Sequence, residues 1–570
     1  MFRHAGTTAG LLATIVLLAT TARAAEPEGG PEGGPVLLEQ GWDEAVRERF
    51  YFTPQGSRMI PYDWFKALER ADGAGLFADP EYLAGFGLLP APVSELNPDG
   101  FPIGITVGPG DAAVLTFAPD PDGLATDARQ VGINCAACHT GMVTVEGRPV
   151  LIDGGPANFD FDSFYAALAQ AVTATQHDDA RFARFASAVL GQESPTGAAE
   201  LRLRFAAFQV RLAGDAVLRR PELASGFGRV DALTQIVNSL AVRDLGEPAN
   251  LHPVAAPTSY PPLWLAPELE FVQWNPIAAS PIARNAGQVL GVFGTTELRA
   301  GSASPFASTM MLDELHALEG WVATLTPPAW DEALMGPIDA GLAEQGAEIF
   351  AENCAGCHNM PPYRRTAPEE NQFGRSFIRI GRVDYREVGT DPAYVEALSK
   401  RLVQTGALAG PLFGGQQVVS APAFFLRTVG AAVEAAMARA GLSQEERIAM
   451  NGYRLRATPS GPRPYEPPSL TDMKASPLAG VWATGPYLHN GSVPTVYELL
   501  SPPEERRAVF WTGGRELDRA RLGFVSEDAP GRFRYDTSLR GNGNQGHAFP
   551  RSGALDHDQR MAVIEYLKTQ

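Results

Sequence analysis

Apolar residues recur at intervals of three and four in several stretches of the chain, and these stretches predict its helices. The sequence from 159 to 190 and from 198 to 218 is rich in alanine and carries apolar side chains at this spacing. A third amphipathic pattern includes Leu315 and Leu318 and stops at Pro327-Pro328. Two consecutive prolines cannot continue a helix, so this helix ends there.

The second half of the chain carries the same pattern near both of its ends. One amphipathic helix is expected just before residue 354, another at the C-terminus, and a third from 423 to 440. The apolar positions that define the first two are Leu342, Ile349, Phe350, Met561, Ile564 and Leu567.

The segment from 257 to 293 has a different character, because prolines alternate in it with large aromatic residues. Trp264, Trp274 and Phe293 stand out among the aromatic residues. Aromatic residues on a loop stiffened by proline can cap the core, but they can also wall a dry pocket. We therefore take these three residues as candidates for a catalytic pocket.

Two short stretches repeat one another and use all four cysteines of the chain. Both have the form C-x-x-C-H. On a helical turn the two thiols and the imidazole face the same way, so one haem can be held by two thioether bonds and one iron–nitrogen bond. The repeated stretches are Asn134-Cys135-Ala136-Ala137-Cys138-His139 and Asn353-Cys354-Ala355-Gly356-Cys357-His358.

Other proteins use paired cysteines as zinc ligands, redox dithiols or disulfides. Here a histidine follows each pair at once, and the chain begins like an exported protein. The pattern therefore predicts two covalently bound haem c groups, attached through Cys135, Cys138, Cys354 and Cys357, with His139 and His358 as iron ligands.

The pattern of the N-terminal residues predicts that the protein is exported. Residues 1–24 combine early basic residues, an apolar run and an Ala-Arg-Ala end, which is typical of a signal peptide. Residues 25–39 begin with a Pro-Glu-Gly repeat that we interpret as a flexible linker. No later apolar run approaches the roughly 18 residues of a membrane span, so we expect a periplasmic or secreted protein.

The predicted fold class is mainly α: two cytochrome c-type haem domains with long irregular loops and extra helices. Residues 40–330 would form the N-terminal haem domain, with helical and aromatic-loop insertions. Residues 337–570 would form the C-terminal cytochrome c-like haem domain, in which one helix leads into the haem motif and another closes the unit.

The acidic balance of the chain limits its partners. The formal net charge is -19, which disfavours nucleic acid and anionic membranes. A small basic electron-donor protein or an uncharged substrate is compatible with this charge.

The sixth ligand of each iron can be sought among nine histidines. His547 and His489 lie in glycine-containing stretches, and glycine lets a neighbouring residue approach a flat macrocycle closely. We favour His547 as the distal ligand of the second haem, with His489 as the alternative. The first haem has no evident protein sixth ligand, so its iron would be open to dioxygen or peroxide.

Several motifs resemble known di-haem proteins. The run from Trp482 to Thr495 resembles the tail signature of bacterial di-haem cytochrome c peroxidases. More of the chain resembles the secreted di-haem rubber oxygenases of the RoxA type. The motifs that carry this second resemblance include Pro61-Tyr62-Asp63-Trp64-Phe65, Gly226-Phe227-Gly228-Arg229, Val272-Gln273-Trp274-Asn275, Ala283-Arg284-Asn285 and Gly546-His547-Ala548-Phe549.

The resemblance implies a mostly helical protein with a peroxidase-type core and large added loops. Its N-terminal haem would bind dioxygen in an aromatic pocket, and its C-terminal haem would be held by His358 and His547. Rubber oxygenases cleave the double bonds of poly(cis-1,4-isoprene) with dioxygen, leaving aldehyde and ketone ends.

Two functions follow from the sequence. The first is a dioxygenase that cleaves C=C bonds of an apolar, polyisoprenoid-like substrate at the N-terminal haem. The alternative is a di-haem cytochrome c peroxidase or an electron-transfer cytochrome, since a shared fold does not fix a reaction. Peroxide cleavage benefits from a distal base or amide, for which the aromatic segment offers Glu270, Gln273, Asn275 and Gln288.

Overall fold

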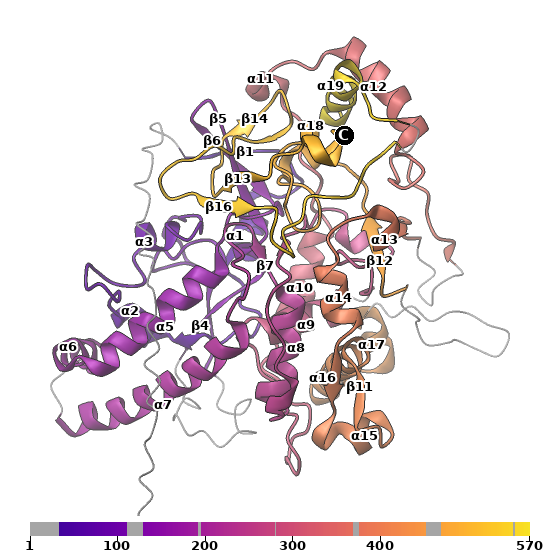
Figure 1. Cartoon of the computed structure of the whole chain (residues 1–570). Coiled ribbons are helices and arrows are strands. Elements are labelled where there is room, and N and C mark those ends of the chain that lie inside the picture. Colours follow the sequence, from indigo (N-terminus) through magenta and orange to yellow (C-terminus); the bar gives the residue numbers. More distant parts are fainter. Residues whose placement is uncertain are drawn as a thin grey trace, which may run out of the picture.

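The computed structural model describes residues 34–110, 129–191, 195–279, 281–368, 376–451, 469–550 and 553–570. The predicted signal peptide and most of the predicted linker lie outside these ranges. Within them, helices and small sheets alternate along the whole chain (Figure 1).

The prediction of a mainly α fold is wrong, because the structure mixes helices with several small sheets. Two sheets near the first cysteine motif have three strands each, and the others have two. The strands of the first are β1 (Val36–Leu37), β6 (Arg148–Asp153) and β5 (Thr140–Val145); those of the second are β2 (Ile60–Pro61), β4 (Gln130–Ile133) and β3 (Ile105–Gly108).

The hairpin of β5 and β6 shows why the strands escaped the sequence analysis. Its turn is Glu146-Gly147, with φ of 52° and 77°, the two positive values of a two-residue hairpin turn. Val143, Val145 and Val150 alternate toward the core. The partner strand β6 buries Val150, Leu151 and Ile152 in succession, so it lacks the alternating pattern that marks a strand, and the other strands have only two to four residues.

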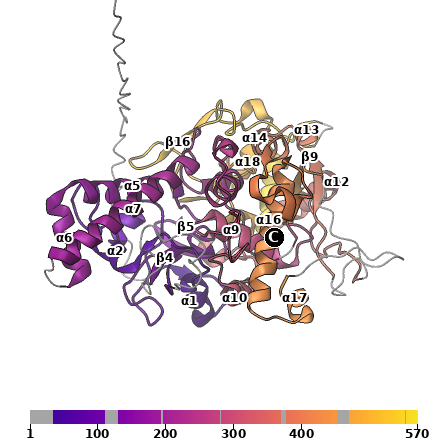
Figure 2. The same cartoon turned by 90° about the horizontal axis from the view of Figure 1, so that it is seen from below.

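The predicted helices of the N-terminal half are confirmed, with one division. The stretch from 159 to 190 forms two helices, α5 (Phe161–His177) and α6 (Asp179–Leu190), because Asp178 caps the second through its side chain. With α7 (Pro195–Arg219) they form a helical layer at one edge of the molecule (Figures 1 and 2). Its core is aromatic, with Trp64, Phe185, Phe205 and Phe208 in contact.

The predicted helices of the C-terminal half are present too. The helix before the second cysteine motif is α12 (Ala340–Asn353), and it packs along the C-terminal helix α19 (His557–Lys568). Gly346 permits this close approach, because an added Cβ would lie 1.9 Å from the carbonyl oxygen of Ala562. The helices predicted around Leu315 and from 423 to 440 are α10 (Leu312–Val322) and α16 (Ala421–Arg439).

One large buried cluster joins the two predicted domains. It includes Trp42 and Phe50 from the N-terminal part together with Trp482 and Ile564 from the C-terminal part. The division at residues 330 to 337 stays a prediction. The other α-helices of the described residues are α1 (Glu44–Phe52), α2 (Tyr62–Ala67), α3 (Pro80–Ala84), α8 (Ala232–Asn238), α9 (Pro281–Gly291), α11 (Glu332–Met335), α13 (Tyr385–Val388), α14 (Ala393–Ser399), α15 (Ala409–Phe413), α17 (Gln444–Asn451) and α18 (Val496–Leu499), and a π-helix, Ser239–Asp244, continues α8.

The C-terminal half contributes most of the two-stranded sheets. Among the described residues, α16 is the one helix long and apolar enough to cross a membrane, with a mean hydropathy of 1.2, and half of it is buried inside the protein. The remaining strands are β7 (Arg229–Val230), β8 (Thr258–Ser259), β9 (Gly381–Asp384), β10 (Leu402–Gln404), β11 (Val418–Ser420), β12 (Asp472–Ala475), β13 (Val509–Thr512), β14 (Leu517–Asp518), β15 (Gly523–Phe524) and β16 (Phe533–Asp536).

The contact of α12 with α19 predicts that Gly346→Ala lowers the free energy of unfolding by about 1–3 kcal/mol, because the new methyl group meets backbone that must move. Gly320→Ala in α10 is the matched control, since nothing lies within 4 Å of its Cβ position, and it should be neutral or stabilise by up to about 1 kcal/mol. Chemical denaturation measures both. Equal stabilities for the two variants would contradict the close packing.

Candidate functional site

The first cysteine motif forms a single helical turn between two strands. Asn134 ends the approach from β4 and holds the turn in place: its side chain accepts a hydrogen bond from Ala136 N and donates one to Phe50 O at 2.8 Å. His139 N donates to Cys135 O at 2.9 Å. This turn therefore places the thiols and the imidazole on neighbouring positions, as the spacing predicts.

A remote carbonyl group fixes the ring of His139. Its Nδ1 lies 2.8 Å from Pro261 O, and since a carbonyl only accepts, Nδ1 must carry the proton. The lone pair is then on Nε2, the nitrogen that can bind a metal. The surroundings also lower the pKa of His139 to about 4 by burial, which keeps the imidazole neutral at physiological pH.

The second motif repeats this arrangement. His358 N donates to Cys354 O at 2.9 Å, and His358 Nδ1 lies 2.8 Å from Ser476 O. The second motif is more open, since Cys357 is exposed. Beside His358 a cavity of about 310 Å³ lies against α12 and is lined by Phe350, Met360 and Tyr566 among others.

The thiols of Cys135, Cys138 and Cys354 are uncharged, which separates them from reactive dithiols. Burial raises the pKa of Cys135 and of Cys138 to about 12, and that of Cys354 to about 11. Redox-active cysteines have the opposite shift, and none of the four is in a disulfide. Neutral, closely spaced thiols beside an imidazole fit the thioether attachment of haem c.

His547 faces His358. Their ring centroids are 6.2 Å apart. Two imidazoles bound to one metal ion at about 2 Å each would have centroids on the order of 6 Å apart. His547 has a φ of 50°, and Gly546 before it is pressed against Thr390, where an added Cβ would lie 2.5 Å from the nitrogen. The glycine next to His547 is therefore required by a close backbone contact.

His489, the alternative distal ligand, has other contacts. Its Nδ1 lies 3.3 Å from Thr390 Oγ1, its ring is 5.8 Å from that of Tyr394, and its carbonyl oxygen accepts from Ser259 N. The structure thus places the ring of His547, and not that of His489, next to the ring of His358, with the two rings tilted by 58°.

The three aromatic candidates lie in different places. Phe293 is buried, has a φ of 61° and stacks on Tyr165 at 5.5 Å between ring centroids. It belongs to the same apolar cluster as Ala137 of the first motif. Trp264 lies in the other cluster, where its Nε1 donates to Ala479 O. The structure does not bring the three together, and their catalytic roles stay predictions.

Trp274 forms hydrogen bonds near both of the backbone carbonyl groups that hold His139 and His358. Its Nε1 donates to Ser259 O at 2.9 Å, two residues before the carbonyl group of Pro261 that holds His139. Its own carbonyl oxygen accepts from Lys474 N at 2.9 Å, two residues before the carbonyl group of Ser476 that holds His358. Trp274 is therefore hydrogen-bonded close to both carbonyl groups that hold the motif histidines.

The sequence analysis did not single out Tyr260, whose ring centroid is 6.2 Å from that of His139. Its hydroxyl donates to Phe159 O, and burial together with the neighbouring Cys138 raises its pKa. The only sequence signal was its position before Pro261-Pro262. A second feature without a sequence signal is an ion pair whose side chains are 10% and 11% exposed: Glu319 accepts from Arg284 at 2.6 Å and from Asn285. Both charges act on Cys135.

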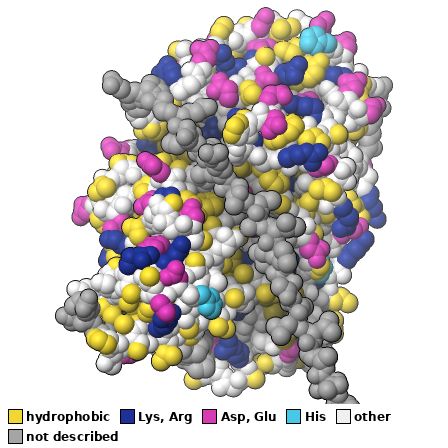
Figure 3. All heavy atoms as spheres, turned by 60° about the vertical axis from the view of Figure 1, so that its left-hand side comes forward, with side chains coloured by type: hydrophobic (Ala, Val, Ile, Leu, Met, Phe, Trp, Pro, Cys, Tyr) yellow, Lys and Arg dark blue, Asp and Glu magenta, His cyan; other side chains and the backbone are white. Residues whose placement is uncertain are grey.

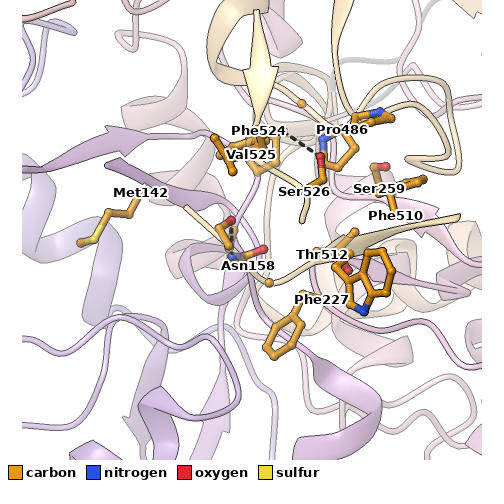
Figure 4. A pocket seen from close by; sticks show the side chains of 18 residues that line it. Met142, Asn158, Phe227, Ser259, Pro486, Phe510, Thr512, Phe524, Val525 and Ser526 are labelled. Carbon is orange, nitrogen blue, oxygen red and sulfur yellow. Dashed lines mark hydrogen bonds between the residues drawn. The ribbon is translucent and has the colours of Figure 1, made fainter. Parts of the chain in front are cut away.

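A separate cavity of about 30 Å³ contains none of the predicted site residues. Figure 4 shows its lining, in which Met142 and Asn158 lie across from Phe524 and Val525. This volume fits one or two water molecules. The candidate functional site is therefore the pair of cysteine motifs and not this cavity.

Comparison with known proteins agrees with the motif analysis in the C-terminal part. A family model described as RoxA-like, cytochrome c-like matches residues 473–512, a segment that includes Ser476 and His489. The chain is 34% identical to "Uncharacterized protein y4iJ" of Sinorhizobium fredii over 93% of its own length and 92% of that protein. It is 26% identical to "Uncharacterized protein y4iM" of the same organism over 62% of its length and 72% of that protein.

The buried ion pair beside Cys135 predicts that Glu319→Gln lowers the free energy of unfolding by about 3–5 kcal/mol, because it leaves the Arg284 charge buried without a counter-charge. The control is Glu396→Gln, whose partners Lys400 and Arg540 are more than half exposed, so that less than about 1 kcal/mol should be lost. Urea denaturation at neutral pH measures both. Equal losses in the free energy of unfolding would show that the Glu319–Arg284 pair stabilises the protein no more than the exposed pairs of Glu396 do.

Proposed function

Because the chain belongs to the same family as the y4iJ protein of Sinorhizobium fredii and contains a RoxA-like cytochrome c-like segment, we propose that it is a secreted di-haem oxygenase. The cytochrome c-like segment implies covalent haem c and suggests a haem-dependent oxidoreductase of the rubber oxygenase kind. The finer proposal is that it cleaves C=C bonds of an apolar, polyisoprenoid-like substrate with dioxygen.

This proposal rests on the difference between the surroundings of His139 and those of His358. His358 faces a second imidazole, that of His547, whereas the ring beside His139 is that of Tyr260. Among the described residues, no second histidine has a ring contact with His139. A haem held by two histidines mainly transfers electrons, and one with an open position can bind a small molecule. The N-terminal motif is therefore the proposed catalytic centre.

The apolar surroundings of the first motif support an apolar substrate. Phe161, Tyr165, Tyr260 and Phe293 belong with Ala137 to one buried cluster. Surroundings of this kind exclude water and favour an apolar alkene over a polar substrate. The haem, attached through Cys135 and Cys138 and bound by His139, would supply the iron chemistry that activates dioxygen.

The remaining residues hold or connect the reacting parts. Pro261 O fixes the orientation and tautomer of His139, and Ser476 O does the same for His358. Phe293 presents its ring from a left-handed backbone conformation against Tyr165. Trp274 lies between the two supports, where it can connect the centres electronically, and Trp264 holds the aromatic segment to the C-terminal region.

A specific observation keeps the peroxidase alternative open. Asn275 is fully buried, its Oδ1 accepts from the Tyr394 hydroxyl at 2.6 Å, and its Nδ2 has no hydrogen-bond partner among the described residues. A buried amide with a free donor is the kind of group that assists peroxide cleavage. Its contact Tyr394 lies beside His489, however, and not beside His139.

The test is to incubate the purified holoprotein with polyisoprene latex under ¹⁸O₂ and to analyse products by chromatography and mass spectrometry. We expect oligo-isoprenoids with labelled aldehyde and ketone ends. Phe293→Ala should lower product formation by about 10- to 100-fold, because misplacement of the substrate by one ångström can cost that much.

The matched control for Phe293→Ala is Phe413→Ala. Phe413 also stacks on another ring, at 6.0 Å from Phe424, but it lies in α15, away from both motifs (Figure 1). The control should lose stability and keep its rate per folded molecule. If carbonyl products were unlabelled or absent and the same preparation turned over peroxide rapidly, the oxygenase proposal would be wrong and the peroxidase alternative would take its place.

Ligation of the second haem by His547 predicts a spectroscopic change in His547→Ala. Loss of the second imidazole should convert one of the two haems from low spin to high spin, seen by absorbance and electron paramagnetic resonance. The control His489→Ala should leave the spectrum of the holoprotein unchanged. If His489→Ala instead converted one haem from low spin to high spin, His489 and not His547 would be the ligand of the second haem.

A further inference from the structure

Lysine is rare in this chain, and one lysine differs from the others. The chain has four lysines, at positions 66, 400, 474 and 568. Three of them form ion pairs with carboxylates: Lys66 with Asp99, Lys400 with Glu396 and Lys568 with Glu565. Figure 3 likewise shows basic side chains next to acidic ones on one face of the molecule. The fourth lysine, Lys474, has no hydrogen-bond or ion-pair partner for its Nζ among the residues that the structure describes.

Lys474 lies near elements that support both cysteine motifs. It belongs to β12, and its backbone N–H donates to Trp274 O at 2.9 Å. Ser476, whose carbonyl group holds the histidine of the second motif, follows two residues later. The charge that acts on Lys474 is that of Arg284, which also acts on Cys135 of the first motif. The ammonium group is therefore placed where it can interact with a group bound at either motif.

The side chain of Lys474 is surrounded by protein, yet part of the residue stays accessible. Burial, and after it the like charge of Arg284, lowers the pKa of Lys474 to about 8, although the residue is only half-buried. His139 and His358 show the same combination of a pKa lowered by burial and a half-buried residue. Both histidines border the spaces in which a haem would be bound, so the combination indicates that Lys474 also borders an internal space.

The nearby carboxylates of the protein do not neutralise Lys474. Glu319 is paired with Arg284, and Asp472, on the same strand as Lys474, has Arg382 as its basic neighbour. Arg382 is also the residue opposite Lys474 in the ladder of β9 and β12, so it adds a positive charge. An enclosed ammonium group without a counter-charge costs free energy. Haem carries carboxylates of its own, the propionate groups, and a charge-assisted hydrogen bond to one of them would remove this cost.

We propose that Lys474 Nζ binds a propionate carboxylate of a haem attached at one of the two cysteine motifs and thereby raises the reduction potential of that haem. Reduction adds an electron, so a positive charge beside the haem favours the reduced form. The inference rests on the proposed haem attachment at both motifs and not on the proposed oxygenase reaction. The haem of either motif can supply the carboxylate, and the experiment separates the two.

The experiment is a spectroelectrochemical titration of the intact holoprotein and of Lys474→Met, in which the two haems are followed separately by their absorbance. We expect Lys474→Met to shift the reduction equilibrium of one haem by about tenfold or more toward the oxidised form, which is about 59 mV for a one-electron couple. Lys474→Arg keeps the positive charge and should return that equilibrium to within about twofold of the unchanged protein. The haem that shifts is the one whose propionate Lys474 binds.

The matched control is Lys400→Met, which removes the same charge from the surface, where the Lys400 side chain is 66% exposed and paired with Glu396. It should leave both reduction potentials unchanged. The haem content of each variant tests the attachment itself, separately from the role of Lys474. With both haems attached, two outcomes would overturn the proposal: potentials that do not change in Lys474→Met, or a change that Lys474→Arg fails to reverse.

If Lys474→Met does not fold, the unchanged holoprotein still decides the question. Lysine labelled with ¹³C in its side chain gives one signal for each of the four lysines in a nuclear magnetic resonance spectrum, and single substitutions by arginine assign these signals. We expect the signal of Lys474 to move when one haem is reduced, because the unpaired electrons of the ferric iron act on nearby nuclei, while that of Lys400 stays in place. A Lys474 signal that responds to the reduction of neither haem would refute the proposal.

Discussion

Each cysteine motif depends on one hydrogen bond between an imidazole and a distant carbonyl group. Cys-x-x-Cys-His brings the thiols and the ring onto one turn, but the turn alone leaves the ring free to rotate. The carbonyl groups of Pro261 and Ser476 remove that freedom from His139 and His358. The contacts span 122 and 118 residues of chain, so each site exists only once a long stretch of the protein has folded back onto it.

The sequence was most informative where the chemistry is local. The spacing within each motif, the glycine beside His547 and the helices before residue 354 and at the C-terminus all follow from residues close together in the chain. Each is present in the structure. The ligand role of His547 stays a prediction, and its position across from His358 supports it.

Contacts between remote segments escaped prediction for a physical reason. A backbone carbonyl carries no side-chain signature, so nothing in the sequence marks Pro261 or Ser476 as a partner of a histidine. The hairpin of β5 and β6 was missed because β6 buries Val150, Leu151 and Ile152 in a row and so lacks alternation, and several small sheets together make the fold mixed. The ion pair of Arg284 and Glu319 joins two helices whose packing was not predictable from their separate patterns.

The late position of the closing elements has a consequence for the order of assembly. Haem must reach the thiols before the surroundings close over them. His547, which lies next to His358, and α19 both follow the second motif in the chain, and α19 packs on the helix that leads into Cys354. Since a chain is made from its N-terminus, the second motif stays open until these later segments have been made and have packed against it. Assembly of the second site thus waits for segments that follow it in the chain, which leaves its thiols accessible while a cofactor is attached.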